Sequence, residues 1–258
     1  MVTSGNLHPL LLIVGGLLVV GVQTYPRQLD SHQEFEITEF ATAKDFDILK
    51  LTQQWPLTIC ATFSNNGMAE FCDSIRGNQW TIHGLWATKL HTRKPAYCDD
   101  SAKFNATAVE SIENRLNVKW PSLKKGRNAS RGFWAHEWEK HGTCSAILTP
   151  INTQRKYFTK TMELSDKYNV EDLLERVNIV PGRSYSIQSI VDGLSRLLGK
   201  RCGVSYVCSR LNQRSYLSEI QICFDKSFKL VDCDNSINSS KGCFATQKII
   251  YPNVLPDL

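Results

Sequence analysis

The sequence lacks several features that would place it in other classes of protein. No two cysteines form a Cys-x-x-Cys pair, and the chain contains no internal repeat and no low-complexity tract. The missing pairs argue against a zinc ribbon and against a thioredoxin-like redox site. Beyond the N-terminal region, no apolar stretch approaches the roughly 20 residues that a membrane-spanning helix needs. We therefore expect the mature chain to contain no membrane span.

The first 24 residues contain no Lys, Arg, Asp or Glu. They include an apolar run over residues 9–22, which is short for a membrane span and typical of the core of a signal peptide. We expect a cleaved signal peptide over residues 1–24, followed by a flexible, polar N-terminal arm over residues 25–44. A retained signal anchor is the alternative, because the basic residues that usually precede such a core are missing.

Composition sets wide bounds on size and partners. With 258 residues and 42% apolar side chains, the chain can form one domain with a full hydrophobic core. The chain has 30 Lys and Arg residues against 25 Asp and Glu residues, a mild positive excess that permits a polyanionic partner without requiring one. Nine cysteines indicate disulfides formed in an oxidising compartment, with at least one thiol left over. If the chain is exported, we expect glycans at the three sequons, Asn105, Asn128 and Asn238.

The hydrophobic pattern predicts both strands and helices. Strands are expected over residues 46–59, ending near Pro56, and over residues 80–86, 220–224, 228–233 and 248–251. Helices are expected over residues 107–118, 153–168, 170–178 and 186–198. These elements do not alternate as βαβ units, which predicts an α+β fold. We expect a single domain over residues 45–258, with a central antiparallel sheet flanked by several helices and stapled by disulfides.

Two short segments carry histidine among tryptophans. They are WTIHGLW at residues 80–86 and FWAHEWEKHGTC at residues 133–144. The second places two His, two Glu and one Lys within the six residues 136–141. A stable core has no use for that density of charge, whereas a site that moves protons around a negatively charged group does. We therefore take both segments as the candidate active site, with His83 expected on a strand.

If residues 133–144 form an α-helix, side chains four positions apart share a face. Glu137 then neighbours His141, and His136 neighbours Lys140. Histidine titrates near neutral pH, so it can both accept and donate a proton. Lys140 supplies a fixed positive charge for an anionic transition state, and the flanking tryptophans can exclude water from the site.

Two other interpretations compete with this one. The zinc-protease helix needs histidines four apart, whereas His136 and His141 are five apart and would be rotated by about 140° on an α-helix. Lys140 would also repel a metal ion, so we expect no metal. A solvated surface helix would not need the neighbouring tryptophans, and an isolated core histidine at position 83 would not be matched by a second histidine segment.

Two imidazoles and one lysine, without a nucleophilic Ser or Cys motif, are what cleavage of a phosphodiester by a ribose 2′-OH requires. One imidazole removes the 2′ proton and the other protonates the leaving 5′ oxygen. The cation stabilises the negative charge that develops on the phosphoryl group. The residues themselves therefore favour an enzyme that cleaves RNA.

The two segments resemble the active-site motifs of the ribonuclease T2 family. IHGLW at residues 82–86 and HEWEKHGTC at residues 136–144 stand in the family's order, and the resemblance extends from QWP at residues 54–56 to YP at residues 251–252. It is closest to the animal extracellular or lysosomal branch.

This resemblance implies a role for each matching residue. His83 matches the proton donor to the leaving group, and His141 matches the base that acts on the 2′-OH. Glu137 and Lys140 match groups that stabilise the charged intermediate. The resemblance also implies that His136 binds phosphate and that Trp86 helps to hold a base, as aromatic stacking allows.

The chain departs from the family at Ala87 and Thr88, where proline and then often an acidic residue are common. These positions lie near the base-binding pocket, so the family's base preference is not carried over. The family's disulfide framework implies the pairs Cys60–Cys72, Cys98–Cys144, Cys202–Cys243 and Cys223–Cys233. Cys208 is then the unpaired ninth cysteine, and a local Cys202–Cys208 bridge is a competing possibility.

Together these features imply a secreted or lysosomal, metal-independent endoribonuclease without a cofactor. It should cleave single-stranded RNA by transesterification to a 2′,3′-cyclic phosphate and then produce a 3′-phosphate. DNA lacks the 2′-OH and should be inert. We expect a monomer with a bell-shaped pH profile, and the resemblance suggests an acidic optimum. The alternative is a secreted glycoprotein with a binding or signalling role on a nuclease scaffold.

Overall fold

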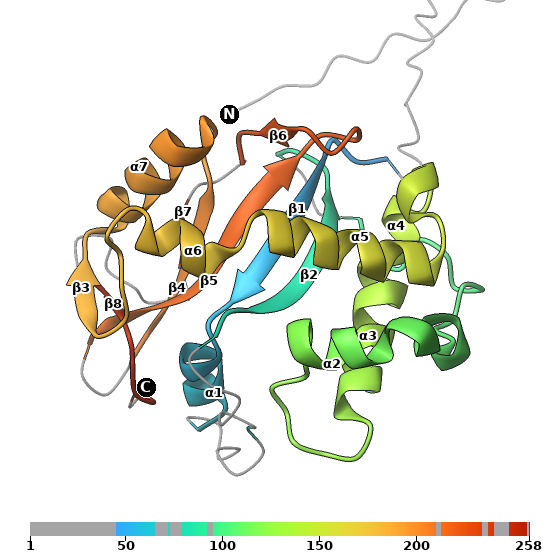
Figure 1. The fold of residues 1–258 in the computed structure, drawn as a ribbon, viewed down its shortest axis with the longest axis horizontal. Helices are drawn as coiled ribbons and strands as arrows, with labels where there is room; N and C mark the ends of the chain where they lie inside the picture. The colour runs from blue at the N-terminus through green and yellow to red at the C-terminus, as the bar shows by residue number, and fades with distance from the viewer. Residues whose placement is uncertain are drawn as a thin grey trace, which may run out of the picture. The chain divides into compact units, whose positions relative to one another are not determined.

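A mixed β-sheet forms the centre of the computed structural model (Figure 1). The structure describes residues 45–64, 72, 79–91, 95–209, 213–233, 237–239, 248–256 and 258. All of them belong to one compact unit that spans residues 41–258. The predicted signal peptide and N-terminal arm lie outside the described residues. Within the described ranges, no helix is both long enough and apolar enough to cross a membrane.

Four antiparallel strands make up the middle of the sheet, which confirms the predicted arrangement there. They follow the order β2 (Thr81–Thr88), β1 (Ile48–Gln54), β5 (Ser215–Phe224) and β4 (Gly203–Cys208). The borders differ from the prediction, because two pairings there are parallel: β7 (Ile237–Ser239) with β4, and β8 (Ile249–Tyr251) with β5. Two short antiparallel strands complete the sheet, β6 (Leu230–Val231) beside β5 and β3 (Arg183–Tyr185) beside β8.

Helices surround the sheet. α5 (Gln154–Lys167) packs against β1 and β2, and in Figure 1 α5 and α6 (Val170–Glu175) cross the front of the sheet. The remaining α-helices are α1 (Pro56–Ser64), α2 (Glu113–Lys119), α3 (Ala129–Glu137), α4 (Thr143–Ser145) and α7 (Ile187–Leu198). Two 3₁₀ helices span Ala106–Ile112 and Thr149–Ile151.

The local sequence explains several element boundaries. Pro56 ends β1 and begins α1, since its fixed φ suits the first helical position and its missing N–H is not needed there. α7 begins after Ser186, whose side chain accepts a hydrogen bond from the N–H of Ser189, and it ends at Gly199 with a φ of 68°. The helix predicted over residues 107–118 is a 3₁₀ helix that continues into α2. The strand predicted over residues 228–233 is shorter than expected, because β6 contains only Leu230 and Val231.

Buried aromatic side chains hold the backbone of β2 in place. Trp120, Trp134 and Tyr157 are completely buried. The indole N–H of Trp120 donates to the carbonyl of His83 at 2.9 Å, and the hydroxyl of Tyr157 donates to the carbonyl of Leu85 at 2.9 Å. Trp134 in turn donates to the carbonyl of Trp120 at 2.7 Å. These bonds connect the strand that carries the first histidine segment to the helical part of the fold.

The structure contains three of the four implied disulfides, Cys60–Cys72, Cys98–Cys144 and Cys223–Cys233. The fourth is wrong, because Cys202 is a buried free thiol, whereas Cys208, expected to be unpaired, is disulfide-bonded. Cys243 lies outside the described residues. Cys202 and Cys208 are six residues apart at the two ends of β4, and six extended residues span about 20 Å. That separation also excludes the competing Cys202–Cys208 bridge, since disulfide-bonded residues have Cα atoms within about 7 Å.

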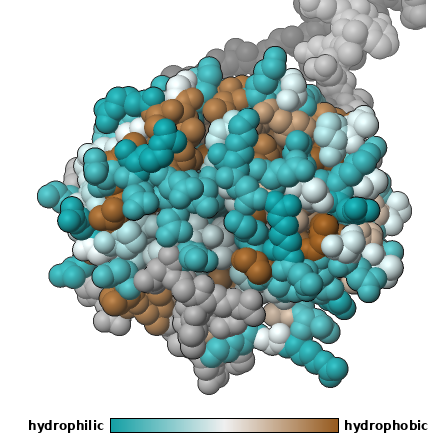
Figure 2. Space-filling view, viewed as in Figure 1, coloured by the Kyte–Doolittle hydropathy of each residue, from teal (hydrophilic) through white to brown (hydrophobic). Residues whose placement is uncertain are grey.

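Two of the three predicted glycosylation sites are exposed. Asn105 and Asn128 both face solvent, and the side chain of Asn105 also accepts a hydrogen bond from the N–H of Thr107. Asn238 lies in β7, and its side chain is outside the described residues. Glycosylation at all three positions stays a prediction. Figure 2 shows that the face crossed by α5 and α6 is mostly hydrophilic, with hydrophobic residues in separate patches.

Candidate active site

His83 enters the site on a β-bulge of β2. In the pairing of β1 with β2, Thr52 faces Gly84 and Gln53 faces Ile82, so His83 is the extra residue on its strand. A bulge bends the strand and changes the direction in which the extra side chain points. The alternation of the sequence predicted the strand, which the structure confirms, but it contains no signal for the bulge.

The imidazole of His83 contacts a carboxylate that the sequence analysis missed. Its Nδ1 lies 2.6 Å from Oε1 of Glu219 on β5, and the two side chains are 31% and 14% exposed. Burial lowers the pKa of His83, and the charge of Lys140 lowers it further. The hydrogen bond and negative charge of Glu219, together with the charge of Glu137, raise the pKa by more than these two effects lower it. The pKa of His83 is therefore raised, which favours the protonated imidazole.

The second histidine segment is not a continuous α-helix. α3 passes into a π-helical turn, Trp138–Gly142, in which the N–H of Thr143 donates to the carbonyl of Trp138, five residues back. The α-helical spacing assumed from the sequence is wrong at this point. His136 and His141, expected to diverge, have ring centroids 6.4 Å apart. π-helical turns of this kind are frequent at functional sites.

Gly142 allows the π-helical turn to pack closely. A Cβ atom at this position would lie 2.4 Å from Cε3 of Trp138. The indole of Trp138 cannot easily move away, because it is buried and its N–H donates to the carbonyl of Ala102 at 2.8 Å. The Cys98–Cys144 disulfide, with a Cα–Cα distance of 4.9 Å, anchors the residues that follow the turn.

Glu137 is a nearly inaccessible carboxyl group at the end of α3. Its residue exposure is 1%, and its Oε2 accepts a hydrogen bond from Nε1 of Trp86 at 2.9 Å. Burial is the largest influence on this group and raises its pKa to about 7, against the lowering effects of the charge of His83, the Trp86 hydrogen bond and the charge of Lys140. Glu137 therefore titrates in the pH range in which histidine also titrates.

Trp86 lies beside both histidines that are predicted to be catalytic. Its ring centroid lies 4.9 Å from that of His83 and 5.3 Å from that of His141, and the residue is 9% exposed. A Cβ atom at Gly84 would lie 2.2 Å from both Nε1 of Trp86 and Oε2 of Glu137, so the close approach of these groups requires glycine. Trp86 thus positions the histidines, and its contact with a base stays a prediction.

His136 has a pKa shift opposite to that of His83. Burial lowers the pKa of His136, and the charges of Lys140 and His83 lower it further. The positive charge of Lys140 lowers the pKa of His83, His136 and Glu137, so Lys140 lies within electrostatic range of all three. The carbonyl of Lys140 accepts the N–H of Tyr97 at 3.0 Å. The structure therefore brings together all six predicted catalytic and substrate-binding residues, which are His83, Trp86, His136, Glu137, Lys140 and His141.

A cleft of about 710 Å³ opens onto the site. His83, His136 and Glu137 line one part of it, and side chains of α1 and of residues 122–133 line the rest. Among the described residues, no three His, Cys, Asp or Glu side chains are grouped so that they could hold a metal ion together. The zinc interpretation therefore has no set of ligands in this part of the chain.

Comparison with known proteins agrees with this geometry. Residues 46–233, more than half of the chain, match the Ribonuclease T2 family. The chain belongs to the ribonuclease T2 family. It is 32% identical over 215 residues to Ribonuclease Oy of Magallana gigas, covering 82% of this chain and 98% of that protein. It is 33% identical over 190 residues to Ribonuclease T2 of Danio rerio, covering 73% of each.

Solved structures of ribonucleases share the fold. Ribonuclease MC1 from the seeds of bitter gourd aligns with a TM-score of 0.67 at 29% identity, covering 80% of this chain and 100% of that one. Human RNase T2 aligns with a TM-score of 0.63 at 26% identity, covering 80% of this chain and 98% of that one. The α+β fold predicted from the sequence is confirmed, and the chain is a ribonuclease of the T2 type.

Proposed function

We propose that this T2-type ribonuclease cleaves single-stranded RNA endonucleolytically, by metal-independent transesterification. The observation that carries the proposal is the placement of His83 and His141 beside the same tryptophan, Trp86, and near the buried carboxyl of Glu137. Two imidazoles in one site can act on the two ends of a single phosphodiester, one as base and the other as acid.

In the first step His141 accepts the proton of the ribose 2′-OH while the 2′ oxygen forms a bond to phosphorus. The bond from phosphorus to the 5′ oxygen breaks, and His83 donates its proton to that oxygen. The products are a 2′,3′-cyclic phosphate and a free 5′-OH. In the second step the two roles are exchanged. His83 accepts a proton from water as the water oxygen forms a bond to phosphorus, the bond from phosphorus to the 2′ oxygen breaks, and His141 donates its proton to that oxygen, which leaves a 3′-phosphate and a free 2′-OH.

Glu219 acts as a positioning residue for the acid. It accepts a hydrogen bond from Nδ1 of His83, so it fixes the tautomer of the ring and leaves Nε2 to serve the leaving oxygen. Its negative charge also helps to raise the pKa of His83. The protonated form of His83 therefore persists to higher pH than in an ordinary histidine, and the alkaline limb of the pH profile moves up accordingly.

Three further groups act on the charge that develops at phosphorus. Lys140 supplies a permanent positive charge. Glu137, with its pKa near 7, can be neutral in the transition state, when its O–H can donate to a phosphoryl oxygen. His136, whose pKa is lowered, can donate a hydrogen bond from its neutral ring. DNA, which lacks the 2′-OH, should not be cleaved.

The same proposal includes export, by way of the predicted signal peptide, to the extracellular space or the lysosome, where disulfides persist. It also includes action as a monomer. Size-exclusion chromatography with light scattering checks the oligomeric state, and N-terminal sequencing of the protein from an expressing cell checks cleavage near residue 24.

The direct test is RNA cleavage by the purified mature protein from about pH 4 to about pH 8 with a chelator present. We expect cyclic-phosphate products from the wild type, at the same rate with and without the chelator, and none from His141→Ala. His91→Asn, which changes an exposed histidine outside the cleft, is the matched control and should keep full activity. Loss of activity with the chelator would refute the metal-free mechanism. A folded protein that cleaves nothing would instead support a binding role on the same scaffold.

A further inference from the structure

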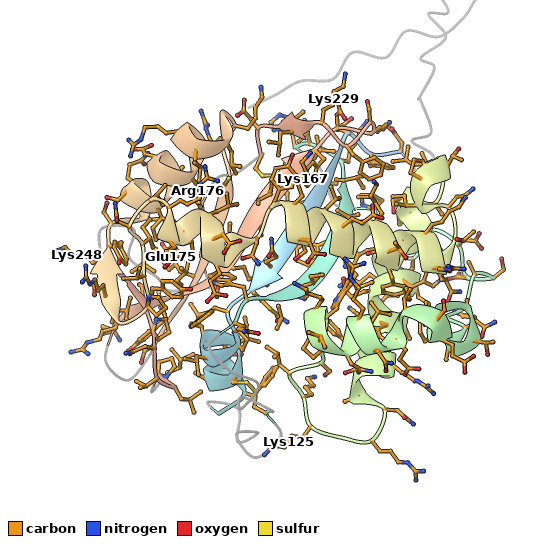
Figure 3. All side chains as sticks on the ribbon, in the orientation of Figure 1. Lys125, Lys167, Glu175, Arg176, Lys229 and Lys248 are labelled. Atoms are coloured by element: carbon orange, nitrogen blue, oxygen red, sulfur yellow. A yellow bond between two sulfur atoms is a disulfide. The ribbon has the colours of Figure 1, made fainter. Side chains whose placement is uncertain are left out.

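The loop between α2 and α3 carries three cations beside the catalytic cleft. Lys124, Lys125 and Arg127 are exposed and line the same cleft as His83 and Glu137. Figure 3 shows Lys125 on this loop, near α1. Lys124 and Lys125 also line a second hollow, together with Glu113 and Asn117 of α2.

Among the described residues, no carboxylate forms an ion pair with the cations of this loop. Within the part of the chain that the structure describes, none of its three cations forms an ion pair, whereas Arg131 in α3 makes two bonds to Glu113 at 2.7 and 2.8 Å. Glu137 is the one carboxylate among the described residues that line the cleft, and it is buried. The cleft therefore presents a surplus of positive charge along one wall.

Hydrogen bonds hold the backbone of the loop, so the three cationic side chains extend from an ordered stretch of chain. Ser130 Oγ accepts the N–H of Ser122 at 3.1 Å, and Ser122 Oγ accepts the N–H of Lys124 at 3.1 Å. Gly126 has a φ of 144°, a conformation that other residues rarely adopt. Lys124 also forms a backbone bridge with Cys72. A preordered set of cations loses less conformational entropy on binding.

The floor of the cleft below these cations is apolar. Ile59 and Phe63 of α1 and Leu123 line it, and Nζ of Lys124 lies 5.6 Å from the centre of the Phe63 ring. A cationic wall beside an aromatic floor is the arrangement that single-stranded nucleic acids require, since phosphates bind to the cations while bases contact the rings.

We propose that Lys124, Lys125 and Arg127 bind the phosphates of RNA nucleotides beyond the scissile dinucleotide, so that the enzyme prefers long single strands to short ones. The proposal rests on the proposed RNA cleavage and extends it from the reacting phosphate to the rest of the strand. The shared cleft supports this role over the commoner one of a solvated surface loop.

The test compares two substrates with a triple variant, Lys124→Ala, Lys125→Ala and Arg127→Ala. A dinucleoside monophosphate has only the scissile phosphate, so its kcat/KM should not change. For a single-stranded oligonucleotide, three lost phosphate contacts should reduce the salt slope of log kcat/KM by about 2, since each contact to a single strand contributes about 0.7. A fourfold rise in salt should then reduce the wild-type value about 20-fold more than the variant value.

The control is a second triple variant with the same loss of charge, Arg155→Ala, Lys156→Ala and Lys167→Ala. These residues are exposed on α5, outside the lining of the cleft. This control variant should keep the wild-type rate on the oligonucleotide and most of the salt slope of log kcat/KM. Binding of single-stranded DNA, which should not be cut, provides a readout that does not depend on catalysis, and only the loop variant should lose it.

Three results would overturn the proposal. They are an equal loss on both substrates, an unchanged salt slope in the loop variant, or an equal effect of the two triple variants. Failure of the wild type to cleave either substrate would refute the proposed function itself, which keeps the two failures distinct. Thermal unfolding of each variant shows that it is folded.

Discussion

Glu137→Gln should make the protein more stable at alkaline pH while it removes activity. The carboxyl of Glu137 has an ordinary pKa of 4.5 and a pKa of about 7 in the folded protein. The folded state therefore holds this proton more tightly than the unfolded state does. Stability falls as pH rises from 4.5 to 7, and above that range the full penalty for a buried charge is present.

The difference of about 2.5 pKa units corresponds to about 3 kcal/mol, at 1.36 kcal/mol per unit. Glutamine has nearly the same shape and keeps an oxygen that can accept the hydrogen bond of Trp86. We therefore expect wild type and variant to have similar free energies of unfolding at about pH 4, and the variant to be about 3 kcal/mol more stable at about pH 8.

Urea unfolding at both pH values measures this difference, and RNA cleavage by the same samples measures the loss of function. Glu139→Gln is the control, because it removes the same charge from the neighbouring turn, where the side chain is 29% exposed. A stability gain that is the same at both pH values would refute the reasoning. So would a variant that is less stable than the wild type at alkaline pH.

Further predictions concern three other positions. Glu219→Gln should lower the pKa of His83 and so move the alkaline limb of the pH–rate profile to lower pH. We expect kcat/KM to fall about tenfold above neutral pH, with little change below it. An unchanged profile would exclude the positioning role of Glu219. Gly84→Ala should reduce kcat at least 100-fold by displacing the indole of Trp86, while circular dichroism shows a folded protein. Cys202 is buried, and burial raises the pKa of its thiol to about 12, so a thiol reagent should label it in urea but not in buffer.

The sequence predicted the catalytic side chains better than it predicted their geometry. The chemistry of the two histidine segments indicated a pair of imidazoles, and the resemblance to the ribonuclease T2 family assigned the two roles to His83 and His141. It could not reveal Glu219, whose contact with His83 joins residues 136 positions apart. Nor could it reveal the π-helical turn, since the periodicity used to read the segment assumed α-helical spacing.

The fold shows the same division. α5 and α7 follow local patterns of apolar residues and caps, so their ranges were predicted closely. β8 was predicted over residues 248–251 and spans Ile249–Tyr251. β3 and β7 also contain three residues each and were not predicted, because such short strands depend on distant partners rather than on their own sequence. The cysteine error has another cause, because the pairing of Cys202 was carried over from the family's disulfide framework, whereas Cys208 is the bonded cysteine in this chain.

The π-helical turn also makes the backbone geometry of the second segment a requirement in its own right. Each residue of an α-helix turns the chain by about 100°, so five residues of regular α-helix would rotate His141 by about 140° from His136. The π turn removes that rotation and brings the two rings to a centroid distance of 6.4 Å. Relatives that keep every catalytic residue at the same spacing but lose the π turn should therefore be folded proteins without nuclease activity, and an alignment by residue type alone would count them as enzymes.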